Sequence, residues 1–459
     1  MQFKQVYIPG LAHCSYVIGG RNACIVVDPA RDVSQYLDIA AGLGLPITGV
    51  IETHLHADFV SGHIELANRT GATIYVSQPA QAGYEHYSVR DGELITHDTL
   101  LIHMVHTPGH TPEGAVFIVS DLERGPAPAL VFTGDTLLIG DAGRPDLFPD
   151  CQDRLTADLY HSLRKIELIG DHVEVYPAHG AGSLCGKQLS SKLSSTIGTE
   201  RMYNPALQLQ PLETFASTFL PGILEAPDHF FRCSEINRRG PSLLAGLSQP
   251  TGYSPYEFQQ MMDSGHVVVD TRDQLPFAAA HLPGAYGLAL EGNFATFAGW
   301  VLPADRPLLL VLESYNDLAR ALRGLHSVGL DLVEGYLEGD MTTWAASGLR
   351  TARMETISIM ELKERLDKDE LILVDARLQS EWEELHIANS IHAPAPDVRS
   401  RYGEWKGDKP VAFICTTGSR SLLACSLMLK YSPTTMVINV FGGIAAWVKA
   451  GYPIITGGE

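Results

Sequence analysis

The sequence is poor in basic residues. It has 33 Lys and Arg against 53 Asp and Glu in 459 residues, so its formal net charge is −20. A surface this acidic repels nucleic acid phosphates and anionic membranes. No apolar run reaches the roughly 18 residues that cross a bilayer, and the N-terminal segment lacks the layout of a signal peptide. The composition therefore predicts no nucleic-acid partner and no membrane partner.

Paired cysteines are also missing. The sequence has seven cysteines, spread along the chain, and no two of them form a CxxC pair. An odd number so widely spaced does not indicate a disulfide framework. Apolar residues make up 45% and charged residues 19%, as in an ordinary globular protein. We therefore expect a cytoplasmic protein, with about three domains at this length.

A segment rich in Pro, Gly and Ser runs from Gly240 to Pro255 and is typical of a linker. Beyond it the chain contains an internal repeat of about 100 residues. A short β-branched strand leads into Asp-x-Arg at Asp270 and again at Asp375, and the segments that end at Trp344 and Trp447 also correspond. Strands alternate with helical patterns in both copies, which predicts parallel α/β sheets. The predicted domains are 1–245, 252–350 and 355–459.

Histidine or aspartate follows four apolar strands of the first domain. The strand at 48–53 leads into His54-Leu-His56-Ala-Asp58, and three later strands lead into the segments that contain His110, Asp135 and His179. Such strand ends can converge on one point, as a metal centre requires. Imidazole and carboxylate together suit Zn or Fe rather than Ca or Mg. Any one histidine alone could be a capping or core residue, but four segments together favour the metal centre.

The HxHxD segment, with the later PGH, TGD and PAH segments, resembles the metallo-β-lactamase superfamily. This resemblance implies an αββα sandwich. Members that bind two metals carry a histidine directly after the aspartate, and here that position is Phe59. A phenyl ring removes a donor and puts apolar surface where the second ion would lie. The dinuclear hydrolases, with glyoxalase II as the nearest, are therefore less favoured.

The segments His54–His63, Gly134–Leu138 and Gly143–Asp146 resemble the persulfide dioxygenases. That family holds one Fe(II) with a facial triad of two histidines and one aspartate, which leaves positions open for a sulfur and O2. The resemblance implies one Fe(II) per chain, bound by His54, His110 and Asp135. It leaves a role in orienting these ligands and bonding the substrate to His56, Asp58 and His179. The alternative for His56 is ligation, as in the zinc enzymes.

Three further residues are candidates for substrate binding. Arg144 and Tyr176 match positions near the family's active site, although Arg144 could equally form a structural ion pair. Cys185 lies in a glycine-rich loop six residues after His179. It could carry persulfide sulfur to the metal, or it could be a small buried loop cysteine.

In the second copy of the repeat, a buried strand at 410–414 leads into Cys415-Thr-Thr-Gly-Ser-Arg420-Ser421 and then an apolar helix. A cysteine on such a loop faces backbone N–H groups and the positive end of the helix, which stabilise a thiolate with the help of Arg420. The loop resembles a rhodanese domain, in which the cysteine carries sulfane sulfur as a persulfide. Thr416 and Gly418 are then expected to contact the substrate. Some arsenate reductases and dual-specificity phosphatases share this architecture, but the phosphatase loop is one residue longer.

The first copy has Glu313 at the nucleophile position. A carboxylate cannot accept sulfur and repels an anionic donor, so this copy is expected to be a degenerate rhodanese. Its expected use is structural, as a spacer or an oligomer contact.

The domain order resembles the bacterial persulfide dioxygenase–sulfurtransferase fusions of the CstB type. This implies oxidation of a small persulfide by O2 to sulfite, and transfer of sulfane sulfur from Cys415 to sulfite, which yields thiosulfate. The expected partners are glutathione or coenzyme A persulfide, O2 and sulfite, and a homo-oligomer is expected. Two alternatives stay open: a zinc thioester hydrolase of the glyoxalase II type, and a sulfur-carrier scaffold without oxygenase activity. The direction of sulfur flow between Cys415 and the iron is also open.

Overall fold

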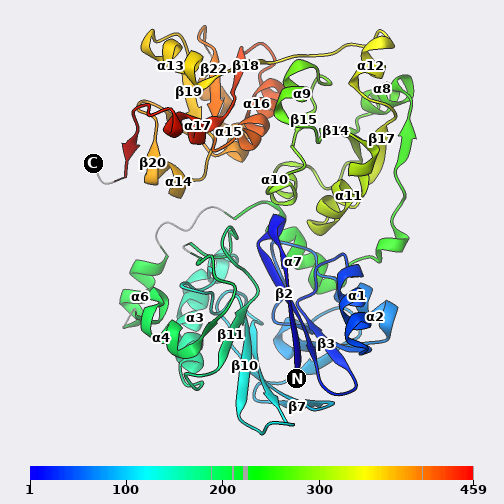
Figure 1. Ribbon diagram of the computed structural model, residues 1–459, viewed down its shortest axis with the longest axis vertical. Coiled ribbons are helices and arrows are strands. Elements are labelled where there is room, and N and C mark those ends of the chain that lie inside the picture. The colour runs from blue at the N-terminus through cyan, green and yellow to red at the C-terminus, as the bar shows by residue number, and fades with distance from the viewer. Residues whose placement is uncertain (188, 209–210, 221–225, 406, 458–459) are drawn as a thin grey trace. The chain divides into compact units, whose positions relative to one another are not determined.

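The computed structural model describes residues 1–187, 189–208, 211–220, 226–405 and 407–457. It divides into two compact units. The first consists of residues 1–247 with 326–329, and the second of residues 248–325 with 330–459. Figure 1 follows the chain by colour from its N-terminus to its C-terminus.

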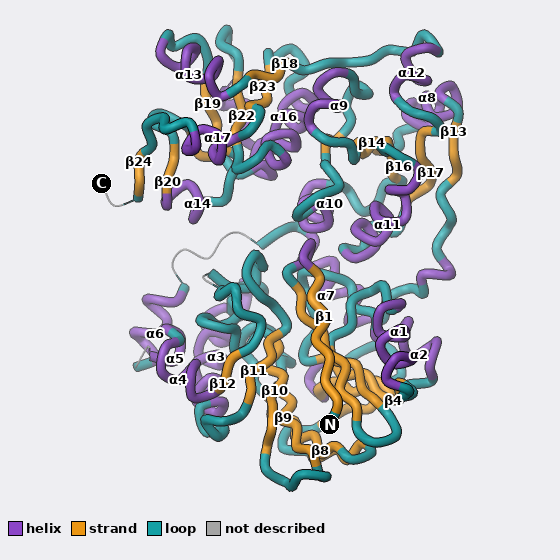
Figure 2. Tube along the Cα trace, viewed as in Figure 1, coloured by secondary structure: helices purple, strands orange, loops and turns teal. Residues whose placement is uncertain are grey.

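Two six-stranded sheets form the centre of the first unit (Figure 2). In one sheet the spatial order is that of the chain: β1 (Gln2–Ile8), β2 (His13–Gly19), β3 (Cys24–Val27), β4 (Ile47–Glu52), β5 (Thr73–Ser77) and β6 (Tyr87–Val89). The other sheet has the order β12-β11-β10-β9-β8-β7. Its strands are β7 (Leu94–His97), β8 (Leu100–His106), β9 (Ala115–Asp121), β10 (Pro128–Gly134), β11 (Glu174–Pro177) and β12 (Ser195–Thr196).

Helices cover the outer face of each sheet (Figure 1). The first sheet is covered by α1 (Ser34–Leu43) and α2 (His63–Thr70). The second is covered by α3 (Gln152–Ile166), α4 (Ile197–Tyr203), α5 (Pro205–Gln208) and α6 (Leu212–Phe219). The unit also contains α7 (His229–Arg239) and the 3-10 turns η1 (Pro9–Leu11), η2 (Gln78–Ala80), η3 (Pro149–Cys151) and η4 (Leu244–Gly246). The predicted αββα sandwich is therefore confirmed.

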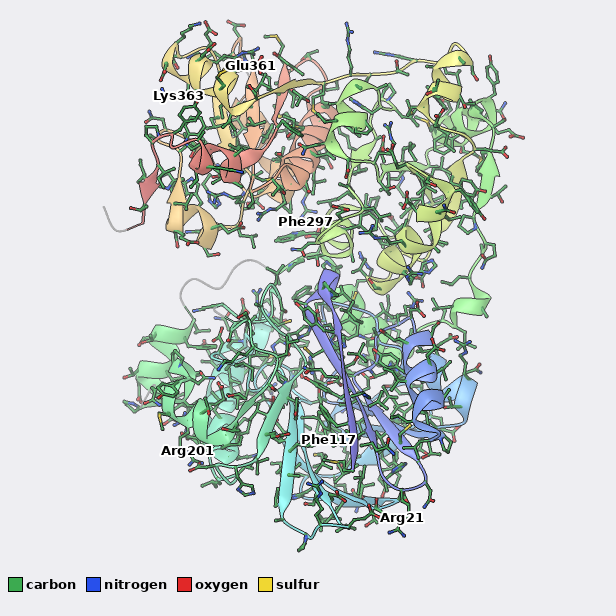
Figure 3. All side chains as sticks on the ribbon, in the orientation of Figure 1. Arg21, Phe117, Arg201, Phe297, Glu361 and Lys363 are labelled. Atoms are coloured by element: carbon green, nitrogen blue, oxygen red, sulfur yellow. The ribbon has the colours of Figure 1, made fainter. Side chains whose placement is uncertain are left out.

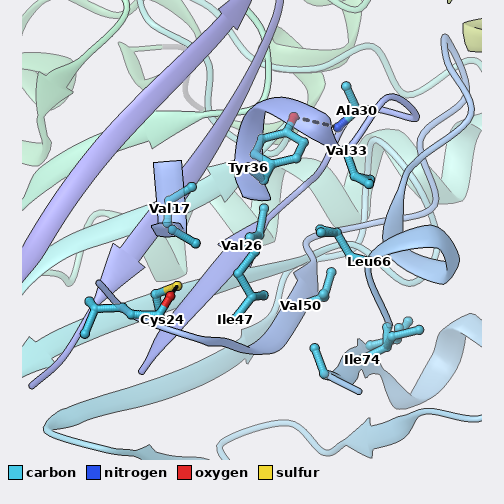
Figure 4. Packing of buried hydrophobic residues seen from close by; sticks show 14 of the residues in the cluster. Val17, Cys24, Val26, Ala30, Val33, Tyr36, Ile47, Val50, Leu66 and Ile74 are labelled. Atoms are coloured by element: carbon cyan, nitrogen blue, oxygen red, sulfur yellow. Dashed lines mark hydrogen bonds between the residues drawn. The ribbon is translucent and has the colours of Figure 1, made fainter. Parts of the chain in front are cut away.

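An apolar cluster fills each of the three spaces between the four layers of the sandwich. Phe117, labelled in Figure 3, is fully buried and packs with Phe132 between the two sheets. Figure 4 shows the cluster between the first sheet and its helices, where Tyr36 of α1 and Leu66 of α2 lie over the strands. The Tyr36 hydroxyl there accepts a hydrogen bond of 2.8 Å from the backbone N–H of Ala30. Strands β3 and β9 are buried along their whole length because a helix layer covers one face and a sheet the other.

The strand ends position the candidate site. β4 ends two residues before His54, and β8 ends four residues before His110. β10 ends directly before Asp135, and its parallel neighbour β11 ends two residues before His179. Loops at the carboxyl ends of strands are where open α/β sheets place their binding sites. None of the described helices is long and apolar enough to cross a membrane.

The second unit contains two five-stranded sheets with the same topology. The first has the order β13-β17-β16-β14-β15 and the second the order β18-β23-β22-β19-β21, and all their ladders are parallel, as predicted. The first sheet consists of β13 (Thr251–Tyr253), β14 (Val267–Asp270), β15 (Tyr286–Gly287), β16 (Leu308–Val311) and β17 (Val333–Leu337). The second consists of β18 (Glu355–Ile357), β19 (Ile372–Asp375), β21 (Ile391–His392), β22 (Val411–Ile414) and β23 (Val437–Val440).

The remaining elements after residue 248 connect the strands of the two copies. In the first copy these are α8 (Pro255–Asp263), α9 (Gln274–Ala279), α10 (Phe294–Val301), η5 (Tyr315–Asp317), α11 (Leu318–Ser327) and α12 (Met341–Ala346). In the second copy they are α13 (Ile359–Asp367), α14 (Gln379–Glu384), η6 (Ala395–Asp397), α15 (Val398–Arg401), η7 (Tyr402–Trp405), α16 (Ser419–Tyr431) and α17 (Gly443–Lys449). A separate antiparallel pair joins β20 (Leu385–His386) to β24 (Ile455–Thr456).

The repeated Asp-x-Arg segments form the same buried ion pair in both copies. Arg272 Nη2 lies 2.6 Å from Asp270, and Arg377 Nη2 lies 2.7 Å from Asp375. Each arginine also donates to a backbone carbonyl eight residues further along the chain. The sequence repeat is thus a repeat of structure. That the first copy is a degenerate rhodanese stays a prediction.

Candidate metal centre and sulfur-transfer loop

Three side chains from different strand ends of the first unit meet at one point. His110 Nε2 is 3.3 Å and His54 Nε2 is 3.9 Å from Oδ2 of Asp135. The three potential ligand atoms lie within 4.8 Å of one another, and all three residues are buried. Two imidazoles and one carboxylate form a donor set that suits iron or zinc.

Hydrogen bonds on the far side of each ring leave Nε2 free to bind a metal. The Thr53 hydroxyl donates to Asp28 at 2.8 Å, so its oxygen accepts from His54 Nδ1 at 3.0 Å. His110 Nδ1 donates to the carbonyl of Arg144 at 2.9 Å. Both Nε2 atoms are buried without a hydrogen-bond partner among the described residues. Burial lowers the pKa of both histidines, so the neutral rings present lone pairs and fit a metal ion.

His179 lies between two carboxylates. Its Nδ1 is 2.8 Å from Asp135, and its Nε2 is 2.8 Å from Asp58. Burial alone would lower the pKa of His179, but the charges of Asp135 and Asp58 raise it well above its usual value. Burial would likewise raise the pKa of Asp135, yet His179 holds it well below its usual range. The three groups therefore form a buried carboxylate–imidazolium–carboxylate chain.

His56 faces a different pair of carboxylates. Its Nε2 is 3.2 Å from Asp28 and 3.8 Å from Glu52, and these three residues form a separate group of potential ligands. Burial, followed by the charge of Asp28, raises the pKa of Glu52 well above its usual value. The ring of Phe59 is fully buried and lies 4.5 Å from that of His56, centroid to centroid. Whether His56 orients the other residues or binds a metal itself stays a prediction.

Cys185 is buried beside the same network. It forms a group of close donor atoms with Asp58 and His179, and its backbone carbonyl accepts from the N–H of Arg144 at 2.9 Å. Burial, with the nearby charges of Asp58 and Asp135, raises the pKa of the Cys185 thiol to about 12. A thiol that stays protonated at neutral pH can donate a hydrogen bond but is a poor nucleophile.

The other two candidates of the first unit have structural partners. Arg144 makes a bidentate bond to Asp146, with both distances 2.7 Å. Its clearest link to the candidate metal ligands is its backbone carbonyl, which accepts the hydrogen bond from His110. Tyr176 packs against Phe3 between the sheets, and its hydroxyl donates to Glu174 at 2.9 Å. Their substrate-binding roles remain predictions.

In the second unit, Cys415 follows β22 directly and begins the loop before α16. The backbone N–H of Gly418 lies 3.1 Å from its Sγ. The Ser421 hydroxyl lies 3.7 Å from Sγ and 2.7 Å from the amide oxygen of Asn439. Backbone N–H donors of this kind stabilise a thiolate or a persulfide anion, as the sequence predicted for this loop.

Arg420 is paired with an acid on α14. Its guanidinium makes a bidentate contact with Glu381 and donates to the Thr416 hydroxyl at 2.7 Å. The Thr416 hydroxyl in turn donates to Glu381 at 3.1 Å. Arg420 therefore stabilises the loop conformation through its contacts with Glu381 and Thr416. Its positive charge would in addition stabilise a thiolate at Cys415.

Two glycines bring α17 against the back of the loop. The N–H groups of Ile444 and Ala445 donate to the carbonyls of Cys415 and Thr416, at 2.8 and 3.1 Å. A Cβ atom at Gly443 would overlap both of these carbonyl oxygens. This close approach explains Gly443, whereas Gly442 has a left-handed backbone with φ of +85°.

Sequence reasoning missed several of these partners. Asp28 directly follows the apolar strand β3, so the strand-end rule that found Asp135 also applies to it. Glu381 lies in the acidic helix α14, where nothing local distinguishes it from a solvated residue. Asn439 lies inside the buried strand β23, and a polar residue among apolar ones is a usable signal.

Family comparisons divide the chain in the same way as the two sites. Residues 8–179, which contain the metal cluster, match the metallo-beta-lactamase superfamily. Residues 358–450, which contain Cys415, match the rhodanese-like domain. The chain thus combines a metallo-β-lactamase domain with a C-terminal rhodanese-like domain.

Relatives of the first domain include persulfide dioxygenases. The mitochondrial persulfide dioxygenase ETHE1 of Bos taurus is 28% identical over 210 residues, which are 45% of this chain and 76% of the relative. A probable polyketide biosynthesis zinc-dependent hydrolase, BaeB of Bacillus velezensis, is 29% identical over 192 residues, 40% of this chain and 79% of the relative. A metallo-beta-lactamase structure from Staphylococcus aureus subsp. aureus COL has a TM-score of 0.67 and 29% identity, and covers 73% of this chain and 98% of its own. The domain matches and these relatives confirm the resemblance to a persulfide dioxygenase–rhodanese fusion.

Proposed function

We propose that the chain oxidises small persulfides with O2 and makes thiosulfate from the product. The first reaction is RSSH + O2 + H2O → RSH + SO3²⁻ + 2 H⁺. The observation that carries the proposal is the convergence of His54 Nε2, His110 Nε2 and the carboxylate of Asp135, with each residue oriented by a hydrogen bond. Fe(II) bound there would supply open coordination positions and the redox chemistry that joins O2 to sulfur. The persulfide dioxygenases among the relatives support this assignment.

The chain's own residues prepare the site. His179 keeps Asp135 ionised and fixes its orientation, while Asp58 holds the second nitrogen of His179. Thr53 and the Arg144 carbonyl fix the tautomers of the two histidine ligands. All of these side chains are buried, so bulk water does not compete for their hydrogen bonds.

We infer that Cys415 performs the second reaction in two steps. The Cys415 thiolate attacks the outer sulfur of RSSH, which forms Cys415–SSH and releases RSH. Sulfite then attacks the outer sulfur of Cys415–SSH, and the bonding electron pair returns to Cys415 as thiosulfate leaves. The Gly418 N–H donor supports this step because it faces the sulfur that regains negative charge. A shared chain raises the effective concentration of the second site for the sulfite made at the first.

A zinc hydrolase is the second candidate, since BaeB is about as similar to the first domain as ETHE1. A two-metal water-activating site needs a donor where the chain has Phe59, and His56 faces Asp28. These two observations favour the mononuclear site. The cysteines form no disulfide among the described residues, which suits a reducing compartment, so we place the reaction in the cytoplasm. We also expect a homo-oligomer, as the sequence resemblance implies.

The test is anaerobic purification, metal analysis, and O2 uptake with glutathione persulfide and with coenzyme A persulfide, with sulfite and thiosulfate quantified. The proposal expects near one iron per chain and O2 consumption with at least one of the two persulfides. Two zinc ions per chain without O2 uptake would refute it in favour of thioester hydrolysis. If the protein binds iron and transfers sulfur but takes up no O2, the dioxygenase proposal fails and only the sulfur-carrier function remains.

A further inference from the structure

A side chain from the first copy of the repeat lies against the sulfur-transfer loop of the second. Gln274 begins α9, and its Nε2 donates to the carbonyl of Thr417 at 3.2 Å. Its Oε1 accepts from the side-chain amide of Asn439 at 2.9 Å. Both copies belong to the same compact unit, so this contact lies within one unit.

The directions of these hydrogen bonds are determined by chemistry. A carbonyl only accepts, so the NH2 of Gln274 must face Thr417 and its oxygen must face the NH2 of Asn439. The Asn439 oxygen then faces the Ser421 hydroxyl, 2.7 Å away. Gln274 therefore reaches the surroundings of Cys415 by two routes, through Thr417 and through Asn439.

The route through Thr417 is the shorter one. The Thr417 carbonyl and the Gly418 N–H belong to one trans peptide, so they point in opposite directions. A donor that holds the carbonyl on one side thus directs the N–H toward Sγ of Cys415 on the other, where it lies at 3.1 Å. Gly418 has φ of +129°, a conformation that glycine adopts without steric cost and other residues rarely adopt.

The glycine also makes room for the glutamine. A Cβ atom at position 418 would overlap the amide group of Gln274. Further contacts join the two copies. Lys430 donates to the Gly284 carbonyl at 3.0 Å, and Gly287 of β15 lies close to Leu422 of α16.

We propose that Gln274 is a positioning residue for the Cys415 loop, and that the first copy serves catalysis by supplying it. The inference rests on the proposed sulfur transfer at Cys415. The copy without a nucleophile then has a specific role in the reaction. It orients the Thr417–Gly418 peptide so that its N–H faces the sulfur that gains charge when the persulfide is discharged.

The test uses the full-length protein without O2, so that oxidation at the metal site does not contribute. Glutathione persulfide and sulfite are supplied, and thiosulfate formation is resolved into kcat and KM. Gln274→Met keeps the size of the side chain and loses both hydrogen bonds. Gln274→Glu keeps the acceptor for Asn439 and loses the donor to Thr417. Gln259→Ala is the control, because Gln259 lies on α8 of the same copy and bonds Asp263 of its own helix.

Both Gln274→Met and Gln274→Glu should lower kcat about three- to tenfold, the worth of one hydrogen bond, with KM for the persulfide within about twofold. Gln259→Ala should match the wild type, and thermal unfolding midpoints should show that all variants are folded. A wild-type kcat in Gln274→Glu would overturn the inference, as would equal losses in KM and thermal stability without a change in kcat. If the wild type makes no thiosulfate, the proposed function fails first and the inference with it.

Discussion

His179 Nδ1 lies 2.8 Å from Oδ1 of Asp135, and this bond links the metal cluster to a second carboxylate. The opposite nitrogen of His179 faces Asp58 at the same distance. The negative charge of Asp135, a candidate metal ligand, is therefore balanced by the charged imidazole of His179 and not by a surface cation. An arrangement of this kind keeps Asp135 ionised in a buried place, which a metal ligand requires.

Replacing His179 should weaken metal binding. In His179→Ala, Asp135 and Asp58 face each other across a cavity without a positive charge, so the ionised form of Asp135 is disfavoured. We expect a loss of about 10- to 100-fold in iron affinity, measured by competition with a chelator under anaerobic conditions. His172→Ala, at an exposed position, is the control. Unchanged affinity would mean that Asp135 does not depend on His179.

The activities of the metal site and of the Cys415 loop should be lost independently when one residue of each is replaced. Asp135→Ala should abolish iron binding and O2 uptake but keep anaerobic sulfur transfer at Cys415. Cys415→Ser should leave O2 uptake with glutathione persulfide largely intact and shift the product from thiosulfate to sulfite. Loss of O2 uptake in Cys415→Ser would show that sulfur flows from Cys415 to the iron, the reverse of the proposed direction.

Phe59 should determine the number of metals. Phe59→His restores the donor that the dinuclear pattern has, beside Asp58 and His179. We expect zinc content to rise from about one toward two ions per chain in protein reconstituted with zinc, measured by elemental analysis. Phe59→Leu changes the size of the side chain without adding a donor, so this variant should still bind about one zinc ion per chain. If both variants bind one zinc, the phenyl ring is not what excludes the second ion.

Much of the metal site could be predicted from the sequence because its residues directly follow apolar strands. Strand ends that carry His or Asp can converge on one point, so His54 and Asp135 could be assigned to one cluster from the sequence, although β4 and β10 lie in different sheets. Asp28 follows the same rule, but it lies outside the histidine-rich segments that mark the site. The Cys415 loop was equally predictable, since it is contiguous in the chain.

The supporting contacts could not be predicted in the same way. Glu381 and Gln274 lie on helices far from Cys415 in sequence, and their contacts with its loop depend on how helices pack, which no local pattern encodes. The same holds for Tyr176, whose neighbours in the core come from other strands. Burial and hydrogen bonding, and not residue type, distinguish such positions.

Cys185 should be inert toward alkylation in the folded protein. Burial raises the pKa of its thiol to about 12, so the thiolate is scarce at pH 8. Because this pKa exceeds that of an unfolded cysteine, the associated stability is complete below about pH 8.5 and is lost as the pH rises toward 12. Iodoacetamide at pH 8, followed by mass spectrometry, should label the less buried Cys151 and spare Cys185 until the chain is unfolded. Rapid labelling of Cys185 in the native state would revive its role as a sulfur carrier.

Gly443 should tolerate no side chain, because α17 approaches the loop closely there. Its φ is +60°, and a Cβ atom would overlap the carbonyl oxygens of Cys415 and Thr416. Gly451 has a similar φ of +73° with no atom within 4 Å of a Cβ, so it is a matched control. Gly451→Ala should cost about 1–2 kcal/mol of stability from backbone strain alone and keep sulfur transfer. Gly443→Ala should cost more and also lower kcat, since the Cys415 carbonyl must move away from Ile444. Equal unfolding free energies and equal kcat values in the two variants would show that the loop has room to shift.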